Sequence, residues 1–267
     1  MEQTKLSVIT INYNNAEGLE RTIASVLSQT YRSIEYIIID GGSKDASVDI
    51  IRKNKDKICK WVSEADAGIY NAMNKGIRMS SGEYLIFLNS GDLFRDQDTL
   101  QHFMQDSGNK DIIYGDTIFR SETGERIKTH PAAISFEFFL YDNLNHQSTL
   151  IRRTLFEIVG LYDEKNKVVS DWAFFVNAIC RFNASYKHVP VPIAVFYQDG
   201  LSSSPENDKL IHREKETFLS DHYQAFLPDY KRLDEYRSAL NLVRLSRLHR
   251  IAEMISGSRF YKFIAGK

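Results

Sequence analysis

The sequence predicts an α/β fold in which helices cover both faces of a mostly parallel sheet. Through its first part, β-branched runs alternate with segments whose apolar residues recur every three or four positions. Strands and helices that alternate in this way form βαβ units, which have right-handed crossovers and parallel strands. Because the loops that follow parallel strands gather along one edge of the sheet, we expect a ligand to bind at that edge.

Each element of the first part follows from its own pattern. The β-branched and apolar runs predict strands at residues 6–11, 34–39, 58–62 and 84–88. Three helices are predicted from apolar faces, which are formed by Leu19, Ile23, Val26 and Leu27, by Val48, Ile50 and Ile51, and by Ile69, Ala72, Met73, Gly76 and Ile77. The strand at 84–88 ends this βαβ train.

The second part has a less regular pattern. An apolar run ends on Tyr114-Gly115-Asp116, and a Gly-containing turn at 121–125 then predicts a hairpin. Apolar residues at helical spacing predict a helix that begins at residue 170 or 171. The remaining elements are expected to be a strand pair at 186–197, a Gly/Ser-rich loop at 198–205 and a charged helix from about residue 206.

The composition excludes several classes of protein. The chain of 267 residues has 34 basic and 35 acidic side chains, and a net charge of −1 selects no nucleic-acid partner. Its two cysteines, Cys59 and Cys180, form neither a zinc-binding spacing nor a disulfide framework. Because no run of roughly 18 apolar residues offers a membrane span, we expect a cytoplasmic protein.

The loops at the predicted edge carry polar and aromatic side chains. Asn12-Tyr13-Asn14-Asn15 follows the first strand, and Asp40-Gly41-Gly42-Ser43 ends the second. A tyrosine ring can stack on a nucleobase while a carboxylate accepts hydrogen bonds, so Tyr13 with Asp40 predicts a nucleoside pocket. The alternative is turn chemistry alone, which Asp-Gly-Gly-Ser also suits. The sequence has no spacing typical of dinucleotide-binding or P-loop phosphate sites.

The strand at 84–88 ends on Asn89-Ser90-Gly91-Asp92, which brings a carboxylate to the same edge. A carboxylate at this position is a candidate for holding a metal ion or for handling a phosphate-bearing ligand. The alternative is that these four residues form only a turn.

Four ordered segments carry a resemblance to a known family. They read SVITINYNN, EYIIIDGGSKDAS, EADAGIYNAMNKGI and SGEYLIFLNSGD, and they extend from Ser7 to Asp92. In this order they resemble family 2 glycosyltransferases, which have the GT-A-type fold. The resemblance implies a three-layer α/β/α sandwich with a Rossmann-like sheet at 1–205, followed by C-terminal helices at 206–267. Within the sandwich it implies a nucleotide-sugar-binding half at 1–100 and an acceptor half at 101–205.

The resemblance also implies roles for single residues on the donor side. Thr10 and Tyr13 would border the nucleobase, and Asp40 would recognise it. Asp66 and Asn74 would line the side of the diphosphate and ribose. The next segment, from Asn89 to Asp92, would occupy the family's acidic metal-binding motif.

This chain departs from that metal motif, which generally has carboxylates at its first, third and fourth positions. Asn89 and Gly91 stand at two of these positions, and Asp92 is the remaining acid. Mg²⁺ or Mn²⁺ in phosphate sites often takes one or two protein carboxylates, so we expect Asp92 alone to hold the divalent cation. A ribose or outer contact is expected to be missing at Gly91, whereas Asn89 still donates and accepts hydrogen bonds.

Asp171 is the strongest candidate for the catalytic base. Its position resembles the family's Glu-Asp base motif, with Ser170 in place of the first acid. A helix N-terminus favours an ionised carboxylate, which suits a base that must start deprotonated. The alternative is a plain helix N-cap. Asp116 and His146 are further candidates for contacting the acceptor or another part of the substrate, and His146 alternatively for contacting the metal, against structural roles for both.

The resemblance implies an inverting glycosyltransferase that moves a sugar from a nucleotide-diphospho-sugar, with a UDP-sugar as the expected donor, to a glycan or lipid-linked acceptor. Bacterial surface-polysaccharide biosynthesis is the expected setting. Two alternatives stay open: a nucleotidyltransferase on a related fold, and a degenerate nucleotide-sugar-binding protein without activity. The basic amphipathic tail from Tyr236 is expected to contact an anionic inner membrane face, to form a homodimer or to pack on its own domain.

Overall fold

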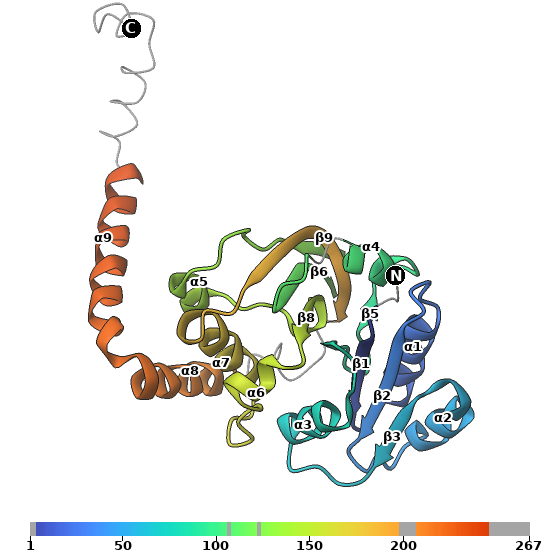
Figure 1. The fold of residues 1–267 in the computed structure, drawn as a ribbon. Helices are drawn as coiled ribbons and strands as arrows, with labels where there is room; N and C mark the ends of the chain where they lie inside the picture. Colours follow the sequence, from blue (N-terminus) through green and yellow to red (C-terminus); the bar gives the residue numbers. More distant parts are fainter. Residues whose placement is uncertain (1–3, 106–107, 122–123, 198–206, 246–267) are drawn as a thin grey trace, which may run out of the picture. The chain divides into compact units, whose positions relative to one another are not determined.

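A computed structural model describes residues 4–105, 108–121, 124–197 and 207–245 (Figure 1). The chain divides into two compact units, Met1–Lys215 and Glu216–Lys267. The strands are β1 (Leu6–Asn12), β2 (Ile34–Asp40), β3 (Lys60–Ser63), β4 (Tyr84–Phe87), β5 (Leu93–Phe94), β6 (Ile112–Ser121), β7 (Gly124–Lys128), β8 (Thr149–Arg152) and β9 (Tyr186–Tyr197). The helices are α1 (Ala16–Leu27), α2 (Ser47–Lys53), α3 (Ile69–Met79), α4 (Thr99–Gln105), α5 (Phe136–Tyr141), α6 (Leu155–Val159), α7 (Ser170–Val176), α8 (Asp208–Tyr223) and α9 (Leu227–Leu245). Short helical segments are η1 (Lys55–Lys57), η2 (His146–Ser148), η3 (Asn177–Arg181) and η6 (Gln224–Phe226).

The described strands form one sheet in the order β3-β2-β1-β4-β8-β6-β9-β5, and β7 pairs with β6. β1 pairs in parallel with β2 and β4, and β2 pairs in parallel with β3. The antiparallel pairs all involve β8, β5 or β7. The predicted βαβ train is therefore confirmed, and the second part of the chain extends it into a mixed sheet.

Alternation along the strands divides the core between the two faces of the sheet. Val8 and Ile38 belong to one apolar cluster, together with Ile23 of α1. The other face receives α3, where a Cβ atom added to Gly76 would lie 2.4 Å from Ile9 Cγ2. Glycine therefore allows a close approach of α3 to β1 that a larger residue would prevent. Figure 1 shows α1 and α2 on one side of β1–β3 and α3 on the other.

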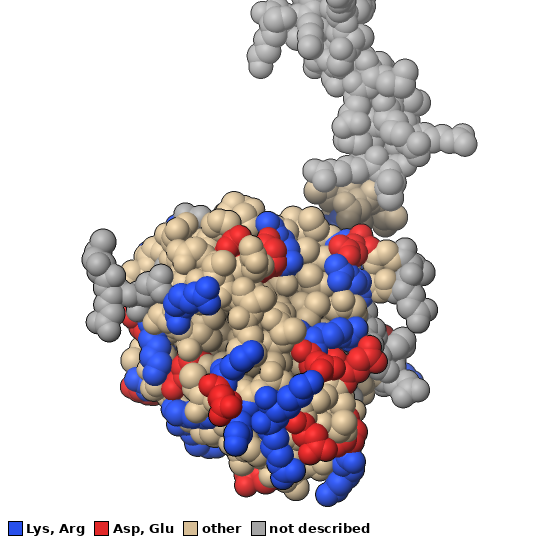
Figure 2. Space-filling model, turned by 90° about the vertical axis from the view of Figure 1, so that its right-hand side faces the viewer, with Lys and Arg blue, Asp and Glu red and all other residues tan. Residues whose placement is uncertain are grey.

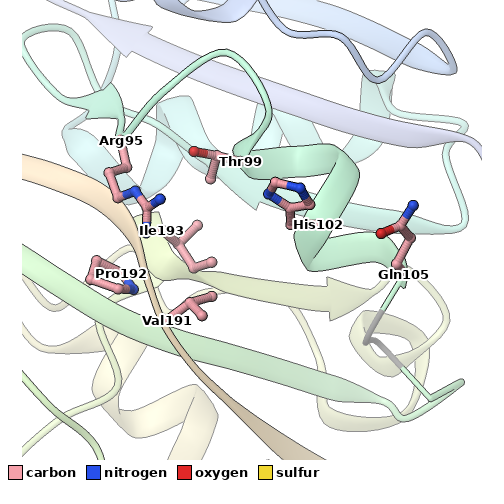
Figure 3. A pocket seen from close by; sticks show the side chains of 7 residues that line it. All are labelled: Arg95, Thr99, His102, Gln105, Val191, Pro192 and Ile193. Atoms are coloured by element: carbon pink, nitrogen blue, oxygen red, sulfur yellow. The ribbon is translucent and has the colours of Figure 1, made fainter.

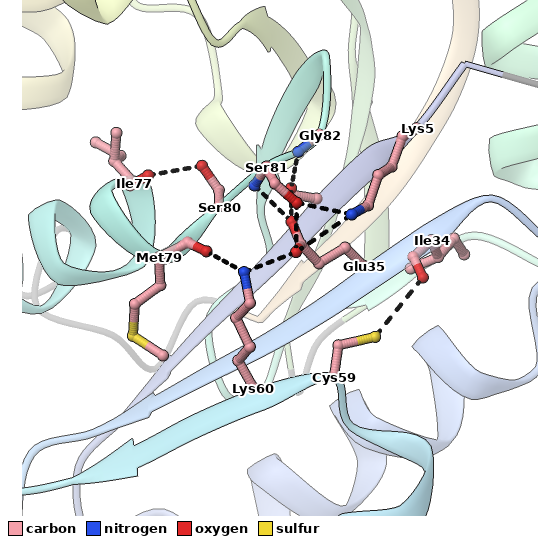
Figure 4. A network of polar contacts seen from close by, with 11 residues as sticks. Lys5, Ile34, Glu35, Cys59, Lys60, Ile77, Met79, Ser80, Ser81 and Gly82 are labelled. Atoms are coloured by element: carbon pink, nitrogen blue, oxygen red, sulfur yellow. Dashed lines mark hydrogen bonds and ion pairs between the residues drawn. The ribbon is translucent and has the colours of Figure 1, made fainter.

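A buried carboxylate ties together the amino ends of β1 to β4 (Figure 4). Glu35, which is 4% exposed, accepts hydrogen bonds from Ser7 Oγ at 2.7 Å, Ser81 N at 2.6 Å and Lys60 Nζ at 2.9 Å. Burial alone would raise the pKa of this carboxyl, but the bonds from Ser7, Ser81 and Lys60 hold it well below its usual value. The network lies at the end of the sheet opposite the candidate ligand edge.

β6 extends beyond the apolar run that ends on Asp116. The strand continues to Ser121, and it pairs with β7 in register from Thr117↔Lys128 to Ser121↔Gly124. The predicted hairpin is thus confirmed, while Asp116 lies in mid-strand. The apolar pattern does not reveal the full length of the strand, because the outer half of β6 is less buried and carries polar residues.

β9 corrects one prediction. Residues 186–197 form one strand rather than a pair, and this strand runs parallel to β6. The ladder shifts register on both sides of Asp116, opposite the segment that holds Pro190 and Pro192. Prolines donate no N–H to a ladder, so an irregular stretch of pairing accommodates them without ending the strand.

The C-terminal predictions are partly covered by described residues. α7 begins at Ser170, as predicted, and α8 and α9 are helices. The Gly/Ser-rich loop at 198–205 and the tail beyond Leu245 lie outside the described residues. Within the part of the chain that the structure describes, no helix is long and apolar enough to cross a membrane. Basic and acidic side chains are interspersed on the face that Figure 2 shows.

Candidate active site

The carboxyl ends of β1, β2 and β3 are held together by one buried carboxylate. Asp40 accepts hydrogen bonds from Asn12 Nδ2 at 2.7 Å, Ser43 N at 3.0 Å and Ser63 Oγ at 2.6 Å. Burial would raise the pKa of Asp40, yet the hydrogen bonds from Ser43, Ser63 and Asn12 lower it overall. Asp40 is thus an ionised anchor for three loops at the predicted ligand edge.

Tyr13 and Asp66 lie close together above these strand ends. A Cβ atom added to Gly41 would lie 3.2 Å from Tyr13 Cδ2 and 3.1 Å from Asp66 Oδ2. The Tyr13 side chain is 67% exposed, and Asp66 Oδ1 pairs with Lys75 Nζ at 2.6 Å. An exposed ring beside a carboxylate can stack on a base while the acid accepts a hydrogen bond.

Two predicted donor-side residues are engaged inside the protein. Thr10 is fully buried, and its Oγ1 lies 3.1 Å from the hydroxyl of Tyr36. Asn74 is 1% exposed, and its amide bonds both the N–H and the carbonyl of Tyr162 at 3.0 and 2.8 Å. Neither side chain has an exposed polar surface, so any effect on a ligand would be indirect.

The tip after β4 is fixed by α1. Gly91 has φ +106°, a conformation that glycine adopts readily, and its N–H donates to Thr22 Oγ1 at 2.9 Å. Asn15 Nδ2 donates to the Ser90 carbonyl at 3.0 Å. Asp92, 5% exposed, is thereby held at the end of the strand.

Asp171 lies at the start of α7 in a network of side chains from distant parts of the chain. Its Oδ1 accepts from the hydroxyl of Tyr70 on α3 at 2.9 Å, and its Oδ2 lies 2.9 Å from His146 Nδ1 on η2. The other ring nitrogen of His146 lies 3.2 Å from Nδ2 of Asn89, beside the β4 tip. The structure therefore brings three of the predicted site residues together.

This network explains how a carboxylate that is 7% exposed stays ionised. Burial would raise the pKa of Asp171, but the hydrogen bond and charge of His146 and the bond from Tyr70 lower it overall. Burial would lower the pKa of His146, while Asp171 and the nearby charge of Asp92 raise it. Burial and the Asp171 carboxylate raise the pKa of Tyr70, which keeps that hydroxyl protonated as a donor.

Asp116 belongs to a different buried cluster. Its Oδ1 accepts from the backbone N–H of His130 at 3.0 Å and lies 2.9 Å from His188 Nε2. The ring of Tyr114 stacks on His188 with centroids 5.2 Å apart. These contacts fit a structural role between β6 and β9, and the predicted acceptor contact of Asp116 stays a prediction.

Comparison with known proteins decides the family. The family model described as glycosyl transferase family 2 matches residues 7–170. The chain belongs to this family. A PGL/p-HBAD biosynthesis glycosyltransferase of Mycobacterium tuberculosis is 29% identical over 216 residues, which cover 78% of this chain and 83% of the relative. An uncharacterized glycosyltransferase of the same species is 35% identical over 179 residues, 65% of this chain and 68% of the relative.

Solved structures of similar fold are also glycosyltransferases. TarS of S. aureus in complex with UDP-GlcNAc has a TM-score of 0.61 at 18% identity and matches 75% of this chain and 61% of its own. The mannosyltransferase PcManGT of Pyrobaculum calidifontis, in complex with GDP-Man and Mn2+, has a TM-score of 0.56 at 14% identity, covering 96% and 85%. The chain spans less than two thirds of the TarS chains that it matches. The GT-A-type fold predicted from the sequence is confirmed.

Metal ligands are sparse in this member of family 2. No group of three or more His, Cys, Asp or Glu side chains lies where it could hold a metal ion among the residues that the structure describes. Asp92 is a hard oxygen donor at the strand tip, and a cation bound to a diphosphate needs only one or two protein carboxylates. A divalent cation at this tip would have the Asp92 carboxylate as its protein ligand, and the metal site stays a prediction.

Two residues that support the site were not singled out from the sequence. Tyr70 was part of a recognised motif, and a buried tyrosine on an apolar helix face signals a hydroxyl that needs a partner. Glu214 accepts from the backbone N–H groups of Lys167 at 2.8 Å and Val168 at 3.1 Å, just before α7. No local sequence pattern predicts this contact, because α8 begins more than thirty residues after α7 ends.

A cavity of about 220 Å³ lies between α4 and β9 (Figure 3). Its lining residues are Arg95, Thr99, His102, Gln105, Val191, Pro192 and Ile193. None of the predicted donor-side or catalytic residues lines it. The cavity is therefore separate from the network around Asp171.

Proposed function

We propose that this protein is an inverting glycosyltransferase that moves a sugar from a nucleotide-diphospho-sugar to a hydroxyl group of a glycan or lipid-linked acceptor. The observation that carries the proposal is the buried Asp171 carboxylate, which contacts Tyr70 and His146 next to the β4 tip. A carboxylate kept ionised at a helix start suits a general base. Membership of family 2 supports sugar transfer as the reaction.

Asp171 would act on the acceptor. In a single displacement, the acceptor oxygen forms a bond to the anomeric carbon while the bond from that carbon to the diphosphate oxygen breaks. The hydroxyl proton passes to the Asp171 carboxylate, and the nucleoside diphosphate leaves with the bond's electron pair. Base catalysis of this kind typically contributes about 10²–10⁴-fold in rate.

Asp92 would act on the leaving group by holding Mg²⁺ or Mn²⁺ together with the diphosphate. Bound there, the cation supplies Lewis-acid stabilisation of the charge that builds on the departing diphosphate. The complex of PcManGT with GDP-Man and Mn2+ supports such a role in this fold. Asp92 and Asp171 thus have separate tasks on the two sides of the sugar.

Tyr13, Asp40 and Asp66 would form the nucleotide side. The adjacency of the exposed Tyr13 ring to Asp66 supports a stacked base or ribose there. Asp40 already accepts several hydrogen bonds, so it would contribute mainly by shaping the loops that meet the nucleotide. Similar structures bound to UDP-GlcNAc and GDP-Man support a nucleotide sugar, and we propose a UDP-sugar as donor.

A named relative and the basic tail of the chain support the proposed acceptor. The mycobacterial relative is named for PGL/p-HBAD biosynthesis, which supports an acceptor in glycan or glycolipid assembly. A basic tail could bring the enzyme to an anionic inner membrane face, where a lipid-linked acceptor would be. The same tail could instead join two copies of the chain.

A donor panel tests the proposal. The purified chain is incubated with UDP-, GDP- and TDP-sugars, with Mn²⁺ or Mg²⁺, and release of nucleoside diphosphate is measured with and without candidate acceptors. We expect release with one class of donor and faster release with acceptor. Binding of a donor without turnover under every condition would contradict an enzyme and favour a nucleotide-sugar-binding protein.

A further inference from the structure

Four buried or partly buried side chains form a continuous hydrogen-bonded chain across the candidate site. Asn89 follows β4, His146 lies on η2, Asp171 lies in the first turn of α7 and Tyr70 belongs to α3. The contacts are 3.2 Å from Asn89 Nδ2 to His146 Nε2, 2.9 Å from His146 Nδ1 to Asp171 Oδ2, and 2.9 Å from Tyr70 to Asp171 Oδ1. Four separate elements therefore meet through one carboxylate.

The ionised carboxylate fixes the direction of the two bonds that it accepts, and the protonation of the His146 ring decides the direction of the third. An ionised carboxylate only accepts hydrogen bonds, so His146 Nδ1 must carry a proton that it donates to Asp171. In the neutral ring, Nε2 is then an acceptor, and the amide N–H of Asn89 supplies its donor. Both Tyr70 and His146 therefore donate toward Asp171, and Asn89 donates toward His146 when the ring is neutral.

Asn89 suits this hydrogen-bonded network better than an acid would. The family generally has an acid at this position, the first of its metal motif. A carboxylate there could only accept, and it would leave the neutral Nε2 without a donor. The amide can also turn to present Oδ1, which is buried and has no hydrogen-bond partner among the described residues. Asn89 can thus serve the neutral or the protonated ring, whereas aspartate could serve only the protonated one.

We propose that His146 is a positioning residue that orients the Asp171 carboxylate by donating to it, and that joins it through Asn89 to the donor-side tip of β4. The inference rests on the proposed function, since it assigns a role within the same reaction. His146 touches neither reacting atom in this role. It acts on the base by occupying one carboxylate oxygen, so that the remaining lone pairs point in a fixed direction.

Several charged or titratable groups face this pair. Tyr70 and Tyr162 face Asp171, and so does Lys215 on α8, while Asp92 faces His146. Burial opposes ionisation of Asp171, and the donor from His146 is the largest of the contributions that lower its pKa. Loss of that donor is therefore expected to raise the pKa of Asp171.

Two substitutions of His146 separate the effect of losing the hydrogen bond to Asp171 from the effect of losing the imidazole ring. In His146→Asn the amide nitrogen stands near the place of Nδ1 and can still donate to Asp171. In His146→Gln the amide reaches the place of Nε2 and leaves Asp171 Oδ2 without this donor. Once a donor sugar has been found, we expect kcat to fall about 10–100-fold in His146→Gln and much less in His146→Asn. The KM for the donor should change little in either variant.

The pH profile gives a second readout. The acid limb of kcat should move to higher pH in His146→Gln and stay in place in His146→Asn, because only the former loses the bond that stabilises ionised Asp171. Equal kcat losses in the two variants, or an unmoved acid limb in His146→Gln, would overturn the proposal. A wild-type chain that turns over no donor would instead count against the proposed function.

A measurement on the ring covers the case in which the His146 variants do not fold. ¹⁵N-labelled histidine in the full chain is observed by NMR, with Asp171→Asn as the comparison. We expect one of the seven imidazoles to carry its proton on Nδ1 and to shift when Asp171 loses its charge. An identical set of histidine signals in both proteins would contradict the His146–Asp171 contact.

Discussion

At the scale of single residues, the Asp171 carboxylate depends on donors from elements that are far apart in sequence. Tyr70 is 101 positions from Asp171, and His146 is 25 positions away. Each donor occupies one carboxylate oxygen, so each can be removed without touching the other. The contribution of Tyr70 is the simpler to measure, since phenylalanine keeps the ring and removes only the hydroxyl.

We expect Tyr70→Phe to lower kcat about tenfold and to leave the affinity for the donor sugar unchanged. The substitution removes a hydrogen bond to the charged Asp171 carboxylate, which acts on the sugar acceptor and not on the donor. Steady-state kinetics and calorimetry measure the two quantities. Tyr84→Phe is the matched control. Tyr84 lies at the start of β4, away from Asp171, and its hydroxyl donates to the Lys110 carbonyl. An unchanged kcat in Tyr70→Phe would argue against a role for this bond in catalysis.

The sequence identified Asp171, His146 and Asn89 as separate candidates, but it could not join them. Their contacts depend on how η2 and α7 pack beside the β4 tip, which no local pattern records. Thr10 illustrates the opposite limit, because the family resemblance alone implied that it borders the nucleobase. Its side chain points to the face of the sheet that holds Tyr36, so it is buried in the protein.

At the scale of elements, the Glu35 network links the amino ends of four strands. Replacing Glu35 by glutamine removes the charge that Lys60 and Lys5 face. We expect Glu35→Gln to lower the free energy of unfolding by about 1–3 kcal/mol at pH 7, measured by urea denaturation. An unchanged free energy would mean that the network adds nothing to stability.

The sign of the pH dependence follows from the lowered pKa of Glu35. The unfolded chain binds the proton near the ordinary value of 4.5, whereas the folded chain binds it only at lower pH. The stabilisation is therefore present above that value and is lost as the pH falls toward the folded pKa. The difference in stability between wild type and Glu35→Gln should narrow in acid, and a difference that grows in acid would contradict this assignment.

The packing of α3 on the sheet depends on Gly76. A methyl group at this position would meet Ile9 Cγ2, and we expect Gly76→Ala to destabilise the fold by about 1–3 kcal/mol. Thermal unfolding measures the loss. The Ile9→Ala substitution removes the clashing atom, so the double variant should be more stable than the sum of the single effects predicts. Strict additivity of the two substitutions would contradict the contact.

The elements themselves were predicted unevenly. Most strands and helices up to Asp92 follow from their local pattern, because β1, β2 and β4 are apolar runs buried on both faces and α1 and α3 each have one apolar face. The four residues of β3 are only partly buried. β9 was misjudged because Pro190 and Pro192 normally end a strand. Its parallel pairing with β6 joins residues about 75 positions apart, and such a contact overrides the local signal.

At the scale of the whole molecule, a bound nucleoside diphosphate, the leaving group of the donor, should stabilise the folded state. With a nucleoside diphosphate and Mn²⁺ at about 100 times the dissociation constant, the gain is about 2.7 kcal/mol. That corresponds to a rise in melting temperature of about 5–10 °C for a chain of this size. Thermal-shift measurements with and without Mn²⁺ or EDTA check the value.

Asp92→Asn should lose the part of this shift that needs Mn²⁺ and keep the part due to the nucleotide alone. Asp49→Asn is the control, since Asp49 is an exposed acid on α2. If the Mn²⁺-dependent rise in melting temperature persists in Asp92→Asn, then Asp92 does not hold the metal.

The central claim is that Asp171 serves the attacking side of the reaction and Asp92 the leaving side. Calorimetry and turnover of Asp171→Asn, with one donor sugar, test it most directly. We predict that kcat falls by about 10²–10⁴-fold while the dissociation constant for the donor stays close to that of the wild type. Retained turnover, or donor affinity lost together with activity, would contradict the claim.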